Sequence, residues 1–204
     1  MRRLRDQSFA NSSEAFEEMF HKGPKPDWFD IPRWEKLLKK FKGGKLMDLG
    51  CFMSQLPVMA KKKYPESEIW ALDQAKEVIE FLAEEYPYIN YTVGDATYTD
   101  FPNGFFDYVV AAELIEHLDY PEALFKEAFR ILKPGGVLAI TTPLEETEAG
   151  EVDGNSHIWS FERNDIKKLA EPYSKRMKIG TLRSKYFPKY KYHFPYIIAY
   201  LWKT

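Results

Sequence analysis

The 204-residue chain has 29 basic and 31 acidic residues, for a net charge of −2, and 45% of its residues are hydrophobic. This length and hydrophobic content suit one well-packed domain, and the balanced charge excludes a general polyanion-binding protein. The single cysteine, Cys51, excludes an internal disulfide framework and is typical of a reducing compartment. The basic amino terminus lacks the apolar segment of a signal peptide, and no apolar run is long enough to span a bilayer. We therefore expect a soluble, cytoplasmic protein.

Two helices are predicted ahead of the sheet, within residues 1–44. Asn11, Ser12 or Ser13 can cap the first helix, and the double glycine after residue 42 ends the second. Between the helices, Trp28 and Phe29 either cover a bound substrate or simply pack on the domain. The apolar faces consist of Phe16, Met19 and Phe20 in the first helix and Trp34, Leu37, Leu38 and Phe41 in the second.

The segment from residue 45 to Asp73 has the pattern of the front half of a nucleotide-binding βαβ unit. An apolar strand ends at Gly50, where the backbone can turn sharply, and Ser54 is placed to cap a helix that begins near Gln55. The free amides at that helix start can bind an anionic or polar group, and Asp73 can accept hydrogen bonds from a ribose diol. The predicted site therefore lies at the carboxyl ends of the strands.

The rest of the chain continues to alternate between helix and strand, which predicts a parallel sheet with helices on both faces. Strands are expected at 90–93, 106–112 and 137–141, with helices after Asp73 and at 121–132. A loop rich in Glu, Gly and Asp then leads to His157 and to a helix with Ser160 as its expected cap.

Six motifs, in the right order and spacing, make the chain resemble the class I S-adenosylmethionine-dependent methyltransferases. The resemblance implies a Rossmann-like α/β fold with a seven-stranded mixed sheet, mostly parallel with an antiparallel last strand. It also implies a single domain, 1–204, made of an N-terminal helical lid or extension at 1–44, a cofactor-binding core at 45–142, and a substrate loop, helix and closing β-hairpin at 143–204. The segments 176–185 and 192–201 can form that hairpin. The motifs are Met47-Asp-Leu-Gly-Cys51, Leu72-Asp73, Gly94-Asp95-Ala96, Phe106-Asp-Tyr-Val-Val110, Glu113-Leu-Ile-Glu-His-Leu118 and Leu132-Lys-Pro-Gly-Gly-Val-Leu138.

The resemblance also implies a cofactor, S-adenosyl-L-methionine, which leaves as S-adenosyl-L-homocysteine, and the residues that hold it. Asp48 and Gly50 would hold its methionyl end, and Asp73 its ribose hydroxyls. Gln74 and Ala96 would border the adenine, and Asp95 would bind its amino group. Each acid has the alternative role of a helix cap or a solvated turn. The implied cofactor-binding set is Asp48, Gly50, Cys51, Phe52, Asp73, Gln74, Asp95, Ala96 and Glu113.

The first loop departs from the Gly-x-Gly-x-Gly pattern of that family, because Phe52 and Ser54 follow Gly50 at the glycine positions. Phe52 puts a bulky side chain where backbone usually approaches the ligand. Either the methionyl end of the cofactor sits differently, or binding is weakened and the chain is a non-catalytic binding or regulatory protein. A dinucleotide is disfavoured because the Gly-x-Gly-x-x-Gly spacing is missing too.

The implied reaction moves a methyl group from a sulfonium to an oxygen or nitrogen nucleophile of a small-molecule acceptor. Most of the catalysis can come from holding the two reactants in line, and this step requires no metal. A base is needed only where the nucleophile arrives protonated, and the candidates are His157, His117 and Glu113. In many family members that act on small molecules a histidine of this loop faces the substrate, whereas the alternative is a surface histidine bonded to the loop backbone.

A nucleic-acid methyltransferase is the second enzyme hypothesis. Glu113, Glu116, His117 and His157 can together bind a divalent ion, and a similar motif marks the RNA 3′-terminal 2′-O-methyltransferases, although it also occurs in members without a metal. After Glu171 the chain has no acidic residue but many lysines and tyrosines. Such a surface can attract an anionic substrate, or its lysines can prevent an exposed sheet edge from pairing with another chain. The small-molecule hypothesis is preferred, with no metal and no membrane insertion expected.

Overall fold

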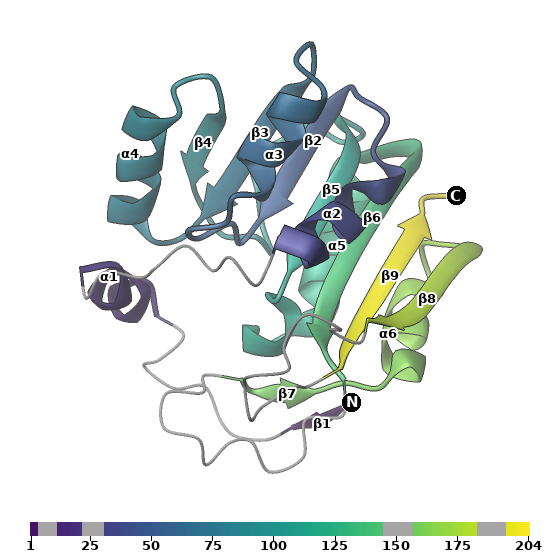
Figure 1. Cartoon of the computed structure of the whole chain (residues 1–204). Coiled ribbons are helices and arrows are strands. Elements are labelled where there is room, and N and C mark those ends of the chain that lie inside the picture. Colours follow the sequence, from purple (N-terminus) through teal and green to yellow (C-terminus); the bar gives the residue numbers. More distant parts are fainter. Residues whose placement is uncertain (4–11, 22–30, 145–156, 183–194) are drawn as a thin grey trace.

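The computed structural model describes residues 1–3, 12–21, 31–144, 157–182 and 195–204, and its centre is a seven-stranded sheet. The order across the sheet is β4-β3-β2-β5-β6-β9-β8, with β9 antiparallel to both neighbours and the other pairs parallel (Figure 1). The α/β fold and the antiparallel last strand are confirmed. The strands are β2 (Lys45–Leu49), β3 (Glu68–Asp73), β4 (Asn90–Val93), β5 (Phe106–Ala112), β6 (Leu132–Pro143), β8 (Arg176–Leu182) and β9 (Tyr196–Trp202).

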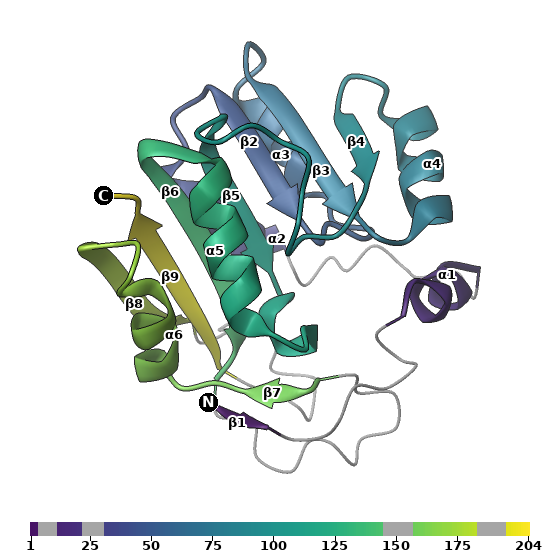
Figure 2. The ribbon, with the colours of Figure 1, turned by 180° about the vertical axis from the view of Figure 1, so that it is seen from behind.

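Helices cover both faces of this sheet. Figure 1 shows α2 and α3 in front of the strands, and Figure 2, from behind, shows α5 and α6 on the other face. A separate two-stranded sheet joins β1 (Arg2–Arg3) to β7 (Trp159–Ser160). The helices are α1 (Ser13–His21), α2 (Ile31–Leu37), η3 (Leu38–Lys40), α3 (Leu56–Lys63), α4 (Lys76–Glu85), η4 (Ile115–His117), α5 (Pro121–Ile131) and α6 (Arg163–Ala170).

The core has two layers because successive strand residues point to opposite faces of the sheet. In β2, Leu46 packs in the layer that contains Trp34 of α2, whereas Met47 packs in the layer that contains Phe125 of α5. All of these side chains are buried. The near-continuous apolar runs of the central strands follow from this burial on both faces.

Two tyrosine hydroxyls attach α2 to the sheet. Tyr108 of β5 donates to the carbonyl of Leu37, and Tyr200 of β9 donates to the carbonyl of Lys36. Both carbonyls lie in the last turn of α2, where the helix leaves its carbonyls without intrahelical partners. The sheet therefore sets the position of this helix and of the residues in its first turn.

The helix starts agree with the sequence at two places and differ at a third. Ser12 Oγ accepts the amide of Ala15 at 3.2 Å. Ser54 Oγ accepts that of Leu56, the first residue of α3, at 3.0 Å, although Gln55 holds the N-cap position of this helix. The expectation that Ser160 caps α6 is wrong, because Ser160 lies in β7, paired with β1. Glu162 is the cap instead, and its amide donates to the carboxylate of Asp165 at 2.8 Å.

Some predictions lie outside the described residues, among them the possible lid formed by Trp28 and Phe29. Within the described ranges, none of the helices is long and apolar enough to cross a bilayer.

Candidate functional site

The first loop turns from β2 toward α3 at the carboxyl end of the sheet. The amides of Gly50 and Cys51 both donate to the carbonyl of Leu72, at 2.8 and 3.0 Å. Gly50 has a φ of +69°, and a Cβ there would lie 2.7 Å from the side chain of Leu114. Glycine is therefore required at this position both for its conformation and for the close approach of Leu114.

Phe52 adopts the left-handed conformation, with a φ of +35°. Its half-buried side chain packs against the cluster formed by Ala75, Val78 and Leu82 at the start and along the length of α4. A bulky residue is accommodated here because its ring turns onto the helix while its backbone takes a conformation that glycine would usually supply.

Asp73, at the end of β3, holds this loop in place. Its Oδ2 accepts the amide of Phe52 at 2.8 Å, and its Oδ1 accepts that of Ala75 at 3.0 Å. A carboxylate has about four acceptor positions, so these backbone bonds leave capacity for a further donor. The side chain that the sequence assigned to a ribose thus has a structural role that the sequence did not reveal.

Asp48 lies beneath the same loop and is buried. Burial, and secondarily the charge of Asp73, raises its pKa to about 8, against a smaller lowering by a hydrogen bond from Ser54. Its Oδ2 has no hydrogen-bond partner in the described part of the chain. Burial likewise raises the pKa of the nearby Cys51 thiol. An unmet acceptor beside a second carboxylate fits a ligand that brings a cationic hydrogen-bond donor, as an ammonium group would.

The remaining residues of the implied cofactor set lie at the ends of β3 and β4. Gln74 and Asp95 are exposed, and Ala96 is buried in the core layer that contains α5. Asp95 Oδ1 accepts both the amide and the hydroxyl of Thr97, each at 2.7 Å. These two bonds at Oδ1 fix the turn that follows β4 and leave the other oxygen of Asp95 available for a further donor.

Glu113 follows β5 in a left-handed conformation, with a φ of +51°. Its carboxylate forms an ion pair with Arg33 of α2 at 3.0 Å, and both side chains are largely shielded. The Arg33 guanidinium also lies 4.9 Å from the ring centre of Tyr196. Sequence reasoning missed Arg33, because no periodicity links residues 80 positions apart; its place beside the buried Trp34 was the one available signal.

Glu116, His117 and His157 come together from two segments. A carboxylate oxygen of Glu116 and one ring nitrogen of each histidine all lie within 4.8 Å of one another. The two ring centres are 4.8 Å apart at an interplanar angle of 75°. The loop around His157 is attached through the amide of Ile158, which donates to the carbonyl of Glu116 at 2.7 Å, and through the indole of Trp159, which donates to that of Leu118 at 2.8 Å.

Glu116 is fully buried in this cluster. Burial, and secondarily the charge of Glu113, raises its pKa to about 8, and the charge of His157 opposes this shift. Thr142 donates to Glu116 Oε2 at 2.9 Å. The sequence identified all three residues of the cluster, but not this burial or the threonine.

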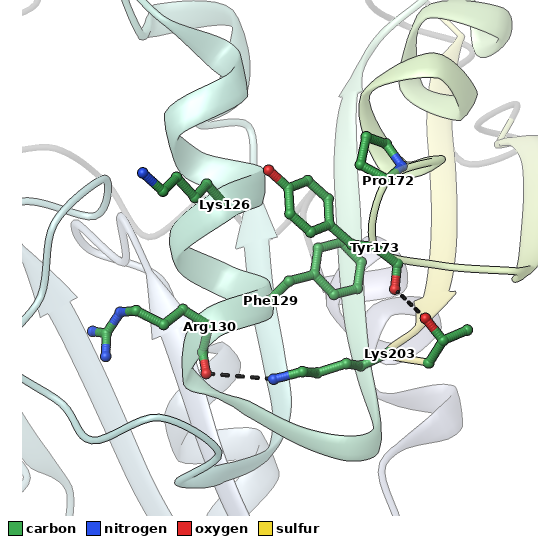
Figure 3. A pocket seen from close by; sticks show the side chains of 7 residues that line it. Lys126, Phe129, Arg130, Pro172, Tyr173 and Lys203 are labelled. Atoms are coloured by element: carbon green, nitrogen blue, oxygen red, sulfur yellow. Dashed lines mark hydrogen bonds between the residues drawn. The ribbon is translucent and has the colours of Figure 1, made fainter.

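A pocket of about 320 Å³ lies elsewhere, where the end of α5 faces the turn after α6 and the end of β9 (Figure 3). Two of its cations are bound by the protein itself: Arg130 pairs with Glu127 at 2.7 Å, and Lys203 donates to the carbonyl of Leu132 at 2.7 Å. The end of α5 lies at the amino edge of the parallel strands. We therefore place the functional site at the carboxyl edge, not here.

Comparisons with known proteins show which family of proteins this chain resembles. A family model described as a methyltransferase domain matches residues 47–140. A malonyl-[acyl-carrier protein] O-methyltransferase of Hahella chejuensis is 31% identical over 124 residues, which are 57% of this chain and 44% of that protein. A ubiquinone/menaquinone biosynthesis C-methyltransferase of Neisseria gonorrhoeae is 30% identical over 104 residues, 48% of this chain and 42% of that protein.

The chain thus spans less than half the length of the curated relatives it matches. Among solved structures, the phosphoethanolamine N-methyltransferase 2 of Haemonchus contortus in complex with S-adenosyl-L-methionine superposes with a TM-score of 0.70 at 17% identity. That superposition covers 98% of this chain and 59% of the other. At this identity it shows a shared fold, and the names of the two relatives differ in the atom that is methylated.

Proposed function

The chain belongs to the class I S-adenosylmethionine-dependent methyltransferases, and we propose that it transfers a methyl group to an oxygen or nitrogen nucleophile of a small-molecule acceptor. The observation that carries this proposal is the buried acidic pair, Asp48 and Asp73, beneath the loop at the carboxyl edge of the sheet. The side chains of Glu113, His117 and His157 follow β5 and β6 at this same edge, so that proton acceptors and the cofactor cradle occupy one side of the molecule.

S-adenosylmethionine supplies a methyl group on a sulfonium, which is a good leaving group. Within the proposal, Asp48, Gly50, Cys51 and Phe52 hold its methionyl end and Asp73 its ribose, while Gln74, Asp95 and Ala96 border the adenine. The chain's own contribution to the rate is to align the two reactants. An acceptor hydroxyl or ammonium also needs a base, for which Glu113, His117 and His157 are the candidates.

The test is calorimetric binding of S-adenosylmethionine and S-adenosylhomocysteine to the purified chain and to three variants. We expect saturable one-to-one binding by the native chain. Asp73→Ala and Asp95→Ala should each weaken it about tenfold or more, since each removes a carboxylate acceptor. Asp95 is exposed, so its substitution tests the site without risk to the core.

The matched control is Asp100→Ala, an exposed carboxylate in the segment between β4 and β5. This variant should bind S-adenosylmethionine and S-adenosylhomocysteine as tightly as the native chain does. If neither ligand binds the folded native protein, the enzyme proposal fails and a non-catalytic binding role takes its place. Binding that all three variants retain would leave the cofactor somewhere other than at this edge.

A further inference from the structure

We propose that Glu116, His117 and His157 bind one divalent transition-metal ion. Two imidazoles and a carboxylate are a donor set that such ions prefer, and zinc in particular is held by two histidines and a glutamate in some catalytic sites. Methyl transfer by itself requires no metal, so this site adds a component to the proposed reaction.

The distances suit such an ion after a small adjustment. Metal–nitrogen bonds of about 2.0–2.1 Å place tetrahedral ligand atoms about 3.3 Å apart. The three ligand atoms here lie within 4.8 Å of one another. Both histidines are only half-buried, so their rings can rotate toward a common centre. Glu116 does not need to move, because η4 and Thr142 fix its position.

The carboxylate of Glu116 provides an independent indication of a missing cationic partner. The side chain is fully buried, and Oε2 accepts a hydrogen bond from Thr142 at 2.9 Å. Oε1 is buried and has no hydrogen-bond partner in the described part of the chain. A buried carboxylate oxygen without a partner is costly, and a coordinated cation would satisfy it. Thr142 then orients the ligand, as outer hydrogen bonds do in metal sites.

Glu113 is not part of this ligand set, and its carboxylate instead forms the ion pair with Arg33 at 3.0 Å. Three protein ligands leave at least one coordination position open, as in catalytic rather than structural sites. That position suits an acceptor hydroxyl, whose pKa the ion would lower. This consequence rests on the proposed function: it narrows the acceptor to oxygen nucleophiles and leaves Glu113 as the candidate base. The binding of the ion does not depend on it.

The test uses the full chain without a polyhistidine tag, stripped with a chelator and titrated with Co²⁺, whose visible absorption reports coordination by protein nitrogen and oxygen. We expect one equivalent to bind and Zn²⁺ to displace it. His117→Ala and His157→Ala should each weaken binding by tenfold or more. The matched control is His21→Ala, a histidine on α1 that pairs with Glu77, which should bind as the native chain does.

Glu116→Gln tests the carboxylate, and circular dichroism establishes whether that buried variant folds; the two histidine variants decide the matter if it does not. The inference is overturned if the native chain binds no Co²⁺, or if His117→Ala and His157→Ala bind as tightly as native. S-adenosylmethionine binding is measured on the same samples. Cofactor binding without Co²⁺ binding would reject the metal site alone, whereas Co²⁺ binding without cofactor binding would reject the methyltransferase proposal alone.

Discussion

In the described part of the chain, two residues other than glycine, Phe52 and Glu113, hold left-handed conformations. Glu113 directly follows β5, and Phe52 lies three residues after the end of β2, both at the carboxyl edge of the sheet. Such a conformation costs roughly 1–2 kcal/mol for a residue other than glycine. Each is held by a specific contact, the bond from Phe52 to Asp73 and the ion pair from Glu113 to Arg33. Strained backbone of this kind is typical of functional sites, which supports the placement of the site at this edge.

The buried carboxyl of Asp48 leads to a prediction about pH. Its pKa rises from 3.8 to about 8 on folding, so between these values the folded chain holds a proton that the unfolded chain has released. The contribution of Asp48 to the free energy of unfolding is therefore fully present below about pH 4 and is lost as the pH rises toward 8. Asp48→Asn removes the titration. We expect the variant to gain stability relative to the native chain by about 1.4 kcal/mol per pH unit between pH 5 and 7.

Urea unfolding of both proteins at several pH values, without ligand, measures this difference. Asp100→Asn, at an exposed position, should show a constant difference from native over the same range. A constant difference for Asp48→Asn as well would mean that Asp48 is ionised in the folded chain.

At the scale of elements, the attachment of α2 decides where Arg33 lies. The hydroxyls of Tyr108 and Tyr200 bind the last turn of the helix, and Arg33 is in its first turn. Tyr108→Phe and Tyr200→Phe should each cost about 1 kcal/mol of stability, because each removes one hydrogen bond at a shielded carbonyl. Hydrogen exchange should accelerate in α2 more than in the sheet.

Tyr120→Phe is the control for this pair, since Tyr120 is 74% exposed. It should change neither the urea midpoint nor the exchange of α2. If the Tyr108 and Tyr200 variants also leave α2 exchange unchanged, the packing of Trp34 and Leu37, rather than the two hydroxyls, holds the helix.

At the scale of the whole molecule, the sheet order predicts where the chain is most stable. The inner strands β2, β5 and β6 are covered on both faces, whereas β4 and β8 lie at the edges with largely exposed or half-buried residues. Amide exchange should therefore be slowest in the inner strands and should fall off toward both edges. Native-state exchange read by mass spectrometry tests this, and faster exchange in β5 than in β4 would contradict it.

From residue 31 onward, local patterns in the sequence were enough to predict the order of the main-sheet strands and of the helices that cover them. They also predict that the site lies at the carboxyl edge of the sheet. Apolar runs that end in Gly50, Asp73 or Glu113 are local signals, and parallel strands must bring their carboxyl ends together. The sequence also identified Glu116, His117 and His157, because a short turn fixes the first two and the motif order suggests the third.

The contacts that these side chains make depend on tertiary packing. Three pairs of residues meet only because their elements pack together, and no local periodicity encodes such contacts. They are Arg33 with Glu113, Thr142 with Glu116, and Phe52 with Asp73. The same holds for the burial that raises the pKa of Asp48, and for Ser160, which pairs with a strand from the other end of the chain instead of capping a helix. Propensity and pattern act over a few residues, whereas ion pairs, burial and strand pairing depend on the whole fold.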